Sequence, residues 1–502
     1  MMERGYRYGF VLGMLVGLTV LCAEPLPAQE PSYKGRSISE WAGDLRHASP
    51  QVRDKAVDSF RSLGPQAIPA LQGVLKDSDP QARQAAIRSL SVIIPVQKDV
   101  VLIVIEALHG ADPAAQQAAA ATWPGLKAKI GRDVILALAD DLKHDKVDVR
   151  RKAAEALAEI RSVEKELLQA LAAALKDAQA VIRQKAAEAL GLIGPEAADT
   201  VAALEQALKD AEAVVRVKAA HALGAVGEKA KSAVPALVQA LKDGDAGVRG
   251  EAAGALGKIG EAAKAAVPAL APMLNDADAK VRAAAAAALG SIGPAAKDAV
   301  AALLQALKDA EALVRRQAAD ALGRIGRPGS DVVAALVQAI GDKDGSVRVS
   351  AVAAIGRLGP AAHESIPALA QALNDGDAAV KQEVTKTLGR IGVMNEKALP
   401  LLVQALKDKD VATRESAAKA LGAIAVASSV PKDVLQAIIV LLKDADAEVK
   451  KSGARALGEI GPKAADAVPA LQELKKDADP DVRKAAALAL SRIEPGAGAA
   501  EG

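Results

Sequence analysis

Apolar residues recur along this chain with the period of an α-helix, and short helical segments alternate with turns. Between Val181 and Ile193 the apolar residues fall at three- and four-residue spacing, the pattern of a helix with one buried face. Gly194 and Pro195 then end the helix, because glycine at a C-cap followed by proline does not continue it. A second amphipathic helix is predicted over 197–208. The pattern therefore indicates pairs of short helices joined by tight turns.

This two-helix pattern returns at a fixed interval. A Val-Arg pair at Val149-Arg150 recurs in eight uninterrupted steps of 33 residues to Thr413-Arg414, since 414 − 150 = 264. With copies on either side, fourteen units are anchored at Arg53, Arg83, Gln116, Arg150, Arg183, Arg216, Arg249, Arg282, Arg315, Arg348, Lys381, Arg414, Lys450 and Arg483. One helix pair exposes apolar residues on both sides, so neighbouring units must stack to bury them. We therefore predict an all-α fold, an α-α superhelix (solenoid) of about fourteen repeats over 39–494.

Composition narrows the class of partner. Apolar residues make up 51% of the chain and aromatic residues only 1%, so the core must consist of small and aliphatic side chains, which suits closely packed helices. The net charge is +2 from 64 basic and 62 acidic residues, and there is no aromatic residue after Trp123. Nucleic acid is not expected as a partner, because neither a global positive field nor stacking side chains are present.

The N-terminus indicates export. Arg4 and Arg7 precede an uncharged run over 9–23 that is short for a membrane span, and a small residue, Ala28, follows at a plausible cleavage position. We interpret 1–28 as a signal peptide, with cleavage after Ala23 or an uncleaved anchor as alternatives. Lipidation of Cys22 is disfavoured because Leu21 precedes it. The mature protein is then periplasmic or extracellular, without membrane insertion, and begins with a linker (29–38); a disordered tail (495–502) ends it.

The repeated residues also carry a family resemblance. The motif Leu-Lys-Asp-x-[Asp/Glu/Gln]-x-x-Val-Arg-x-x-Ala-Ala-x-Ala-Leu-Gly-x-Ile-Gly-Pro recurs over about 40–493 and resembles the HEAT-repeat family, in particular its short bacterial subclass named after phycobilisome lyases (PBS lyases). The resemblance implies an α-solenoid whose repeated Asp and Arg residues pair between neighbouring units as a ladder. Carried over by position, the ladder residues are Asp177, Arg183, Asp210, Arg216, Asp243, Arg249, Asp276, Arg282, Asp309, Arg315, Asp342 and Arg348, continued by Asp375, Asp408, Asp444 and Asp477. Gln116, in place of a base, predicts a weak rung.

Catalytic motifs are not evident, and we predict neither enzyme activity nor a cofactor. The repeated Asp-x-Asp, as in Asp342-Lys343-Asp344, lacks the twelfth-position Glu of a calcium loop and is expected to cap helices instead. His363-Glu364 is the only His-Glu pair of the kind used by HEAT-like di-iron hydroxylases, and we place it on an exposed turn. A metal-dependent hydroxylase or a phycobilin-lyase relative therefore remains a minor alternative.

The positions that vary between repeats point to a binding face. On the Val-Arg helix, which we expect to line the concave face, the fifth and ninth residues after the anchor are not fixed by the core. In the later repeats these positions become basic: Arg324, Arg357 and Arg390 fall 33 residues apart and are joined by Lys386 and Lys419. We predict that they bind an acidic segment of a protein partner; the alternative is a solvated charged face.

The expected role is a non-enzymatic protein-interaction scaffold of the cell envelope or exterior, of unknown oligomeric state. An accessory or regulatory subunit of an exported enzyme complex is the alternative from another class, and a structural spacer is a third. Trp41 and Phe60 are expected to cap the open end of the stack, because terminal repeats are atypical. Trp123 either fills a gap in an irregular unit or projects to solvent.

Overall fold

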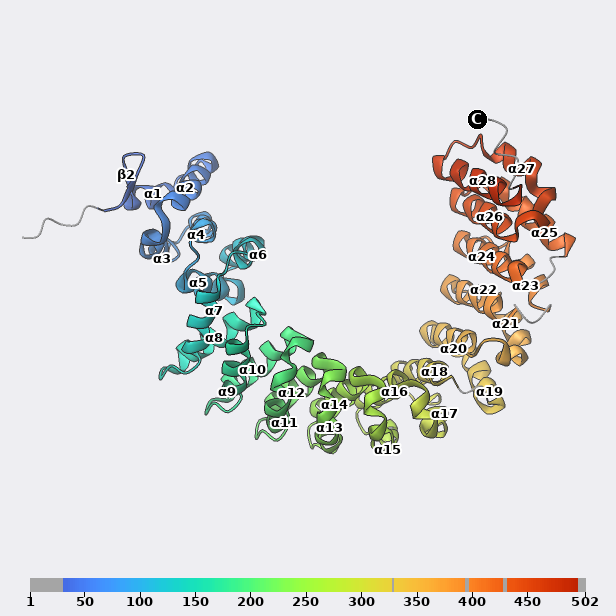
Figure 1. Ribbon diagram of the computed structural model, residues 1–502, viewed down its shortest axis with the longest axis horizontal. Helices are drawn as coiled ribbons and strands as arrows, with labels where there is room; N and C mark the ends of the chain where they lie inside the picture. The colour runs from blue at the N-terminus through green and yellow to red at the C-terminus, as the bar shows by residue number, and fades with distance from the viewer. Residues whose placement is uncertain (1–29, 327–328, 393–396, 428–430, 495–502) are drawn as a thin grey trace, which may run out of the picture. The chain divides into compact units, whose positions relative to one another are not determined.

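The computed structural model describes residues 30–326, 329–392, 397–427 and 431–494 (Figure 1). The predicted signal peptide (1–28) and tail (495–502) lie outside these residues. The described chain is helical apart from one antiparallel hairpin of two-residue strands, and it divides into two compact units, Met1–Val134 and Ile135–Gly502. The prediction of an all-α fold is confirmed.

The first unit begins with the hairpin and contains six helices among its described residues. These elements are β1 (Ser32–Tyr33), β2 (Arg36–Ser37), α1 (Ile38–Asp44), α2 (Pro50–Leu63), η1 (a 3-10 segment, Gly64–Ala67), α3 (Ile68–Val74), α4 (Pro80–Val92), α5 (Lys98–His109) and α6 (Pro113–Lys127). Helices α2, α4 and α6 pack against one another in chain order. The stack therefore begins within this unit.

The described part of the segment interpreted as a linker (29–38), residues 30–38, contains regular structure. It holds the hairpin, which packs on α1 and α2, and the first residue of α1. The buried Trp41 indole donates a hydrogen bond to the carbonyl of Tyr33 (3.2 Å), and the Arg36 guanidinium lies 4.3 Å from the Trp41 ring centre. Phe60 is fully buried and Trp123 is buried on α6, so of the two readings of Trp123 the structure favours the filling of a gap.

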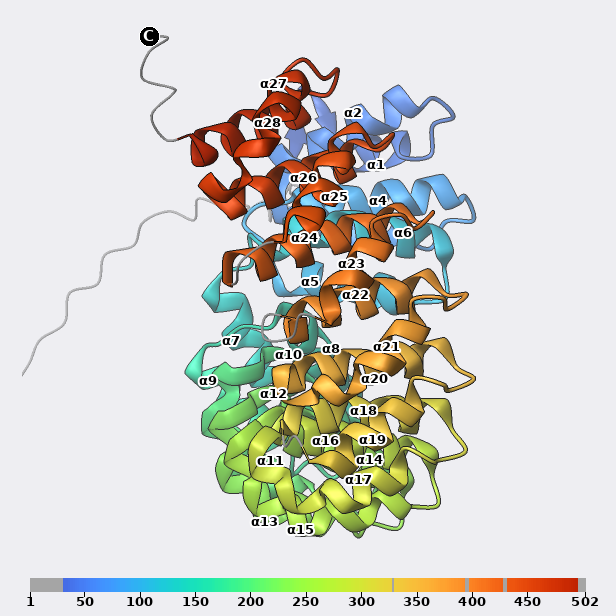
Figure 2. The same ribbon diagram turned by 90° about the vertical axis from the view of Figure 1, so that its right-hand side faces the viewer.

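The second unit continues the helix pairs from α7, which crosses the boundary between the units. Its α-helices are α7 (Arg132–Asp141), α8 (Val147–Ile160), α9 (Lys165–Ala174), α10 (Ala180–Ile193), α11 (Val201–Ala207), α12 (Ala213–Val226), α13 (Val234–Ala240), α14 (Ala246–Ile259), α15 (Val267–Leu270), α16 (Ala279–Ile292), α17 (Val300–Ala306), α18 (Ala312–Ile325), α19 (Ser330–Ala339), α20 (Gly345–Leu358), α21 (Ile366–Ala372), α22 (Ala378–Gly392), α23 (Ala398–Ala405), α24 (Val411–Ala427), α25 (Lys432–Val440), α26 (Ala447–Ile460), α27 (Val468–Leu474) and α28 (Pro480–Ile493). From α8 on, each even-numbered helix packs against the next, and Figure 2 shows α20, α22, α24 and α26 stacked in chain order. The anchor residues fall on the even-numbered helices α2 to α28, as the repeat predicts.

The second helix predicted over 197–208 is shorter in the structure. A 3-10 segment, η2 (Gly194–Thr200), occupies the first part of this range. Helix α11 begins only at Val201 and ends at Ala207, with Leu208 as the C-cap of α11. Gly194 has a φ of +76°, which lets the chain turn sharply out of α10, and Pro195 fits the first turn of η2 because its missing N–H costs nothing there. The tight turn leaves fewer residues for α11.

Glycine at the eighth position after the anchor brings neighbouring even-numbered helices into backbone contact. A Cβ atom placed on Gly323 would lie 2.6 Å from the Cα of Ala354, and one placed on Gly257 would lie 2.9 Å from the Cα of Ala288. Both distances are too short for van der Waals contact, so these positions have no room for a side chain. The small facing alanines complete the close contact, and the spacing of the stack is set here.

One apolar stretch of the second unit is long enough to cross a membrane by length and composition, but it is not a single helix. It spans 279–306 and comprises α16, the 3-10 segment η6 (Gly293–Ala299) and α17. Gly293 has a φ of +73°, so the chain turns between the two helices. Because α16 packs between α14 and α18, its apolar character is that of a helix inside the stack.

Candidate functional site

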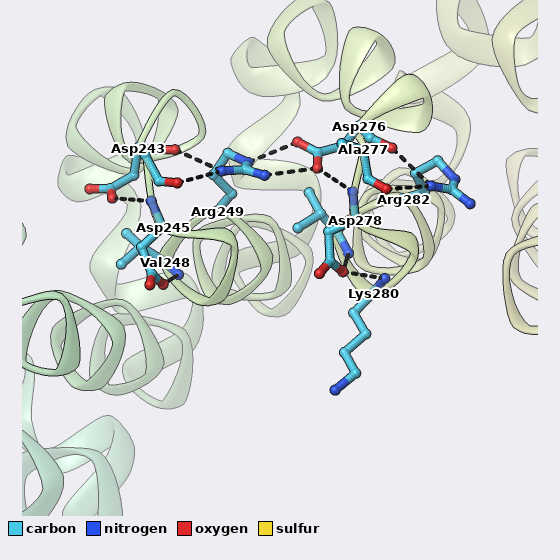
Figure 3. A network of polar contacts seen from close by, with 11 residues as sticks. Asp243, Asp245, Val248, Arg249, Asp276, Ala277, Asp278, Lys280 and Arg282 are labelled. Carbon is cyan, nitrogen blue, oxygen red and sulfur yellow. Dashed lines mark hydrogen bonds and ion pairs between the residues drawn. The ribbon is translucent and has the colours of Figure 1, made fainter.

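A ladder of ion pairs joins the starts of the even-numbered helices α8 to α26 to the next unit, as the family resemblance implies. Nε and Nη2 of Arg249 donate to the two carboxylate oxygens of Asp276 (2.8 and 2.9 Å), while its Nη1 donates to the carbonyls of Asp243 and Gly244 (2.9 and 3.2 Å). Arg282 repeats the arrangement one unit later, with its Nε donating to Asp309 (2.7 Å). Figure 3 shows Arg249 beside the Asp276 carboxylate and Arg282 beside the carbonyls of Asp276 and Ala277. Each arginine therefore fixes the turn before its own helix and ties it to the next turn.

The ladder runs through the second unit with little variation. The closest nitrogen–oxygen distances are 2.6–2.8 Å in Arg150–Asp177, Arg183–Asp210, Arg216–Asp243, Arg249–Asp276, Arg282–Asp309, Arg315–Asp342, Arg348–Asp375, Lys381–Asp408, Arg414–Asp444 and Lys450–Asp477. Their side chains are less than one-fifth exposed, so little of them is left for a partner. These residues hold the stack together.

The first rung of the first unit differs from the rungs of the second unit. Asp77 accepts from Nε of Arg46 (2.5 Å), not from the anchor Arg53. Arg53 instead donates to the carbonyls of His47 and Ala48, and its Nε is buried without a hydrogen bond. The step from Arg53 to Arg83 is 30 residues rather than 33, so the sequence offset of the later rungs does not apply here.

The degenerate repeat at Gln116 changes the next rung as well. Gly110 stands six residues before this anchor, where the repeats from Arg183 on have aspartate. Arg83 pairs with Asp112 (2.5 Å), the N-cap of α6. The amide of Gln116 donates to the carbonyl of Leu108 (3.3 Å). A neutral hydrogen bond thus stands where other units have a charged one.

The ladder predicts a pH dependence of stability. The Arg216 guanidinium beside Asp243 holds the pKa of that carboxyl below its usual value, and Arg249 does the same for Asp276. A lowered folded-state pKa contributes stability that is complete above the unfolded pKa of about 3.9 and is lost as the pH falls through the folded value. Asp243→Asn is therefore expected to be less stable than wild type at neutral pH, with a difference that shrinks towards about pH 3. Urea midpoints followed by circular dichroism measure this; a pH-independent difference would contradict it.

The second aspartate of Asp-x-Asp caps a helix, as predicted. Asp344 accepts from the backbone N–H groups of Ser346 and Val347, whereas Asp342 belongs to the ladder. Among the described residues, no group of three or more His, Cys, Asp or Glu side chains is placed to hold a metal ion. His363 and Glu364 are exposed on the 3-10 segment η7 (Gly359–Ser365), the turn where we expected them.

The five basic residues predicted to bind a partner each lie beside a carboxylate of this chain. Arg324 and Arg357, from adjacent even-numbered helices, both pair with Asp320: Nε of Arg324 lies 2.8 Å from one carboxylate oxygen and Nη1 of Arg357 lies 2.7 Å from the other. The arginine side chains are 51% and 38% exposed, but that of Asp320 only 25%. The cluster therefore presents mainly guanidinium groups to solvent.

The other three bases also lie beside carboxylates. Glu383 lies between Lys386 (3.4 Å) and Arg390 (3.8 Å), and Glu415 pairs with Lys419 (2.5 Å). The bases are 50–58% exposed, whereas Glu383 is 16% and Glu415 25% exposed. We call the surface formed by Arg324, Arg357, Lys386, Arg390 and Lys419 the basic face.

The sequence-based site missed these carboxylates, although a signal was present. Asp320 lies four residues before Arg324, Glu383 three before Lys386 and Glu415 four before Lys419, the spacings at which helix side chains meet. The contact between Arg357 and Asp320 has no such signal, because it depends on the approach of two helices.

A hollow of about 430 Å³ lies between α22 and α24 on the basic face. It is lined by Lys386, Gly389, Arg390, Ser416, Lys419, Ala420 and Ala423. Three cationic side chains thus surround a floor of glycine and alanine. The sequence did not predict this hollow.

Repeated helix pairs stacked through their even-numbered helices define an α-solenoid. The profile of HEAT repeats matches 41–123, 101–191, 200–290, 267–355, 300–377, 333–422, 366–439 and 434–501, which together cover most of the chain. The chain belongs to the HEAT-repeat family. No curated protein matches the sequence.

Solved structures share this fold at low sequence identity. A structure of importin beta matches with a TM-score of 0.58 at 16% identity, over 91% of this chain and 72% of that one. Yeast importin-beta (Kap95p) matches with a TM-score of 0.55 at 15% identity, over 91% and 68%. Kap121p bound to Ste12p matches with a TM-score of 0.50 at 16% identity, over 87% and 54%. At these identities the likeness establishes the fold alone.

Proposed function

We propose that this protein is a non-enzymatic interaction scaffold that binds an acidic segment of a protein partner on its basic face. The observation that carries the proposal is the difference in exposure: five bases present their charge to solvent while the carboxylates between them are mostly covered. Ladder bases of the same repeats are nearly buried, so the fold itself does not require this second set of cations.

The fold supports protein binding in general. One of the solved structures that share this fold is Kap121p bound to Ste12p. Stacked repeats offer an extended surface whose variable residues can be changed without altering the core. Nucleic acid fits this face less well, because the described part of the chain after Trp123 has no aromatic side chain for base stacking.

The setting we propose is the bacterial cell envelope or exterior, from the basic and apolar N-terminus and the PBS-lyase type of the repeat. An accessory subunit of an exported enzyme complex is the form of this role in which the partner is an enzyme. Both versions use the same face and the same chemistry.

The experiment is affinity capture from the exported fraction of the source cells, with the full chain as bait. The test variant carries Arg324→Gln, Arg357→Gln and Arg390→Gln, which remove charge without placing new carboxylates beside Asp320. The wild type is expected to recover a stoichiometric protein with an acidic segment, and the variant to lose most of it. Mass spectrometry identifies the protein and its amount.

The matched control carries Lys209→Gln, Lys242→Gln and Lys308→Gln. These exposed lysines lie at turns before even-numbered helices, away from the basic face, and the charge change is the same. Equal recovery by wild type and test variant, or no stoichiometric protein at all, would overturn the proposal. Melting curves of both variants show whether they are folded.

A further inference from the structure

The hollow on the basic face arises where a repeat lacks a long side chain at its ninth position. In several other repeats that side chain reaches over the preceding helix: a Cβ atom placed on Gly356 would lie 3.1 Å from Nη1 of Arg390, and one on Gly224 would lie 3.2 Å from Cδ of Lys258. Beside Gly389 the ninth residue of the next repeat is Ala423, whose methyl group is too short to do so. The surface stays open there.

Charge makes the hollow suitable for an anion. Lys386, Arg390 and Lys419 line it, while their partners Glu383 and Glu415 are not among its lining residues. With three bases and two acids, the immediate surroundings keep one net positive charge. A bound carboxylate would accept hydrogen bonds from ammonium and guanidinium groups that are already held in position.

The floor favours the close approach of a peptide. Gly389, Ala420 and Ala423 offer a small apolar surface without projecting side chains, and the hydroxyl of Ser416 can donate or accept one hydrogen bond. Exposed charges alone give little affinity, so a recess in which they converge is the better anchor point.

We infer that this hollow is the anchor point of the basic face and takes a glutamate or aspartate side chain from an acidic segment of the protein partner. The inference rests on the proposed function and adds the place and the chemistry of recognition. A partner carboxylate enters between α22 and α24, with its chain lying across Ala420 and Ala423.

The test uses a fluorescein-labelled hexaglutamate peptide and anisotropy at about 150 mM salt, where distant exposed charges are screened. The decisive variant is Ala423→Leu, which leaves the charge unchanged and fills the hollow; Leu192 occupies the same repeat position naturally. The control is Ala225→Leu, the same substitution at the same position of another repeat. We expect Ala423→Leu to weaken binding about tenfold and Ala225→Leu to change it less than about twofold.

A second peptide tests whether binding depends on the carboxylates. A hexaglutamine peptide of the same length lacks the charge and is expected to bind at least about tenfold more weakly. If Ala423→Leu binds hexaglutamate with unchanged affinity, the hollow is not the anchor point. The peptide then binds the basic face as a whole. Lack of saturable binding of hexaglutamate to the wild type would overturn the inference as well.

The two proposals fail in different ways. If affinity capture finds no stoichiometric protein but hexaglutamate still binds and Ala423→Leu weakens it, the scaffold role is wrong and the hollow is supported. The opposite result is also possible: capture succeeds and depends on the arginines, while Ala423→Leu changes neither the amount of captured protein nor the affinity for hexaglutamate. The scaffold role is then supported, and the inference about the hollow is wrong.

Discussion

Gly323→Ala is expected to lower the free energy of unfolding by about 2 kcal/mol, because overpacking a close backbone contact forces the helices apart. The added methyl carbon would lie 2.6 Å from Cα and 2.8 Å from Cβ of Ala354, and neither atom can move without its helix. In a stack, that displacement affects the interfaces on both sides. Urea denaturation followed by circular dichroism at 222 nm, the ordinary helix signal, measures the loss.

Gly254→Ala is the matched control for this prediction. Gly254 also lies inside an even-numbered helix, but a Cβ atom there would meet nothing within 4 Å. Alanine is favoured over glycine inside a helix by about 1 kcal/mol, so this variant is expected to gain up to that amount. The two Gly→Ala changes should therefore have opposite signs. Equal stabilisation by both would show that the helices do not touch at Gly323.

The second large effect is expected from Arg249→Met in the ladder. The substitution removes the two guanidinium nitrogens that donate to the Asp276 carboxylate, whose side chain is 9% exposed. It also removes the nitrogen that donates to the carbonyls of Asp243 and Gly244. Removing one partner of a nearly buried ion pair costs about 3 kcal/mol, because the remaining carboxylate then keeps a neutral donor, the backbone N–H of Asp278, in place of a guanidinium. The urea midpoint at neutral pH measures it.

Arg249→Lys separates the ion pair from the carbonyl contacts. The chain itself uses lysine at Lys381, whose Nζ lies 2.8 and 2.9 Å from the two carboxylate oxygens of Asp408. We expect Arg249→Lys to lose about half as much stability as Arg249→Met, because the charge stays but the fork geometry is lost. Lys476→Met, which removes an exposed pair with Glu473, is expected to cost less than about 0.5 kcal/mol. Similar losses in all three variants would contradict a structural ladder.

Structure and binding chemistry use the same residue types in this protein, and burial separates their roles. Arg315 in the ladder is 7% exposed, whereas Arg324, nine residues later on the same helix, is 51% exposed. One is held by the next repeat and the other remains accessible. Substitutions at ladder positions should therefore alter stability, and substitutions on the basic face should alter binding.

The sequence by itself determined the repeat, the helix pairs and the capping role of the second aspartate in Asp-x-Asp, and its resemblance to HEAT repeats implied an Asp–Arg ladder between units. The repeat, the helix pairs and the caps are periodic or local, so hydrophobic spacing and turn residues suffice to predict them. Where the period breaks, at the 30-residue step after Arg53, the offset of the later rungs does not apply and Arg46 pairs with Asp77 in place of the anchor.

Only the tertiary structure decided which cations remain exposed and where the surface is open. Asp320 accepts from Arg357 of the following helix, and Gly389 lines a hollow because Ala423 does not reach over it. Both results depend on how closely two helices approach and how far a side chain extends between them. The distance between the helices is set by glycine and alanine in backbone contact, and it cannot be predicted from the spacing of residues along the sequence.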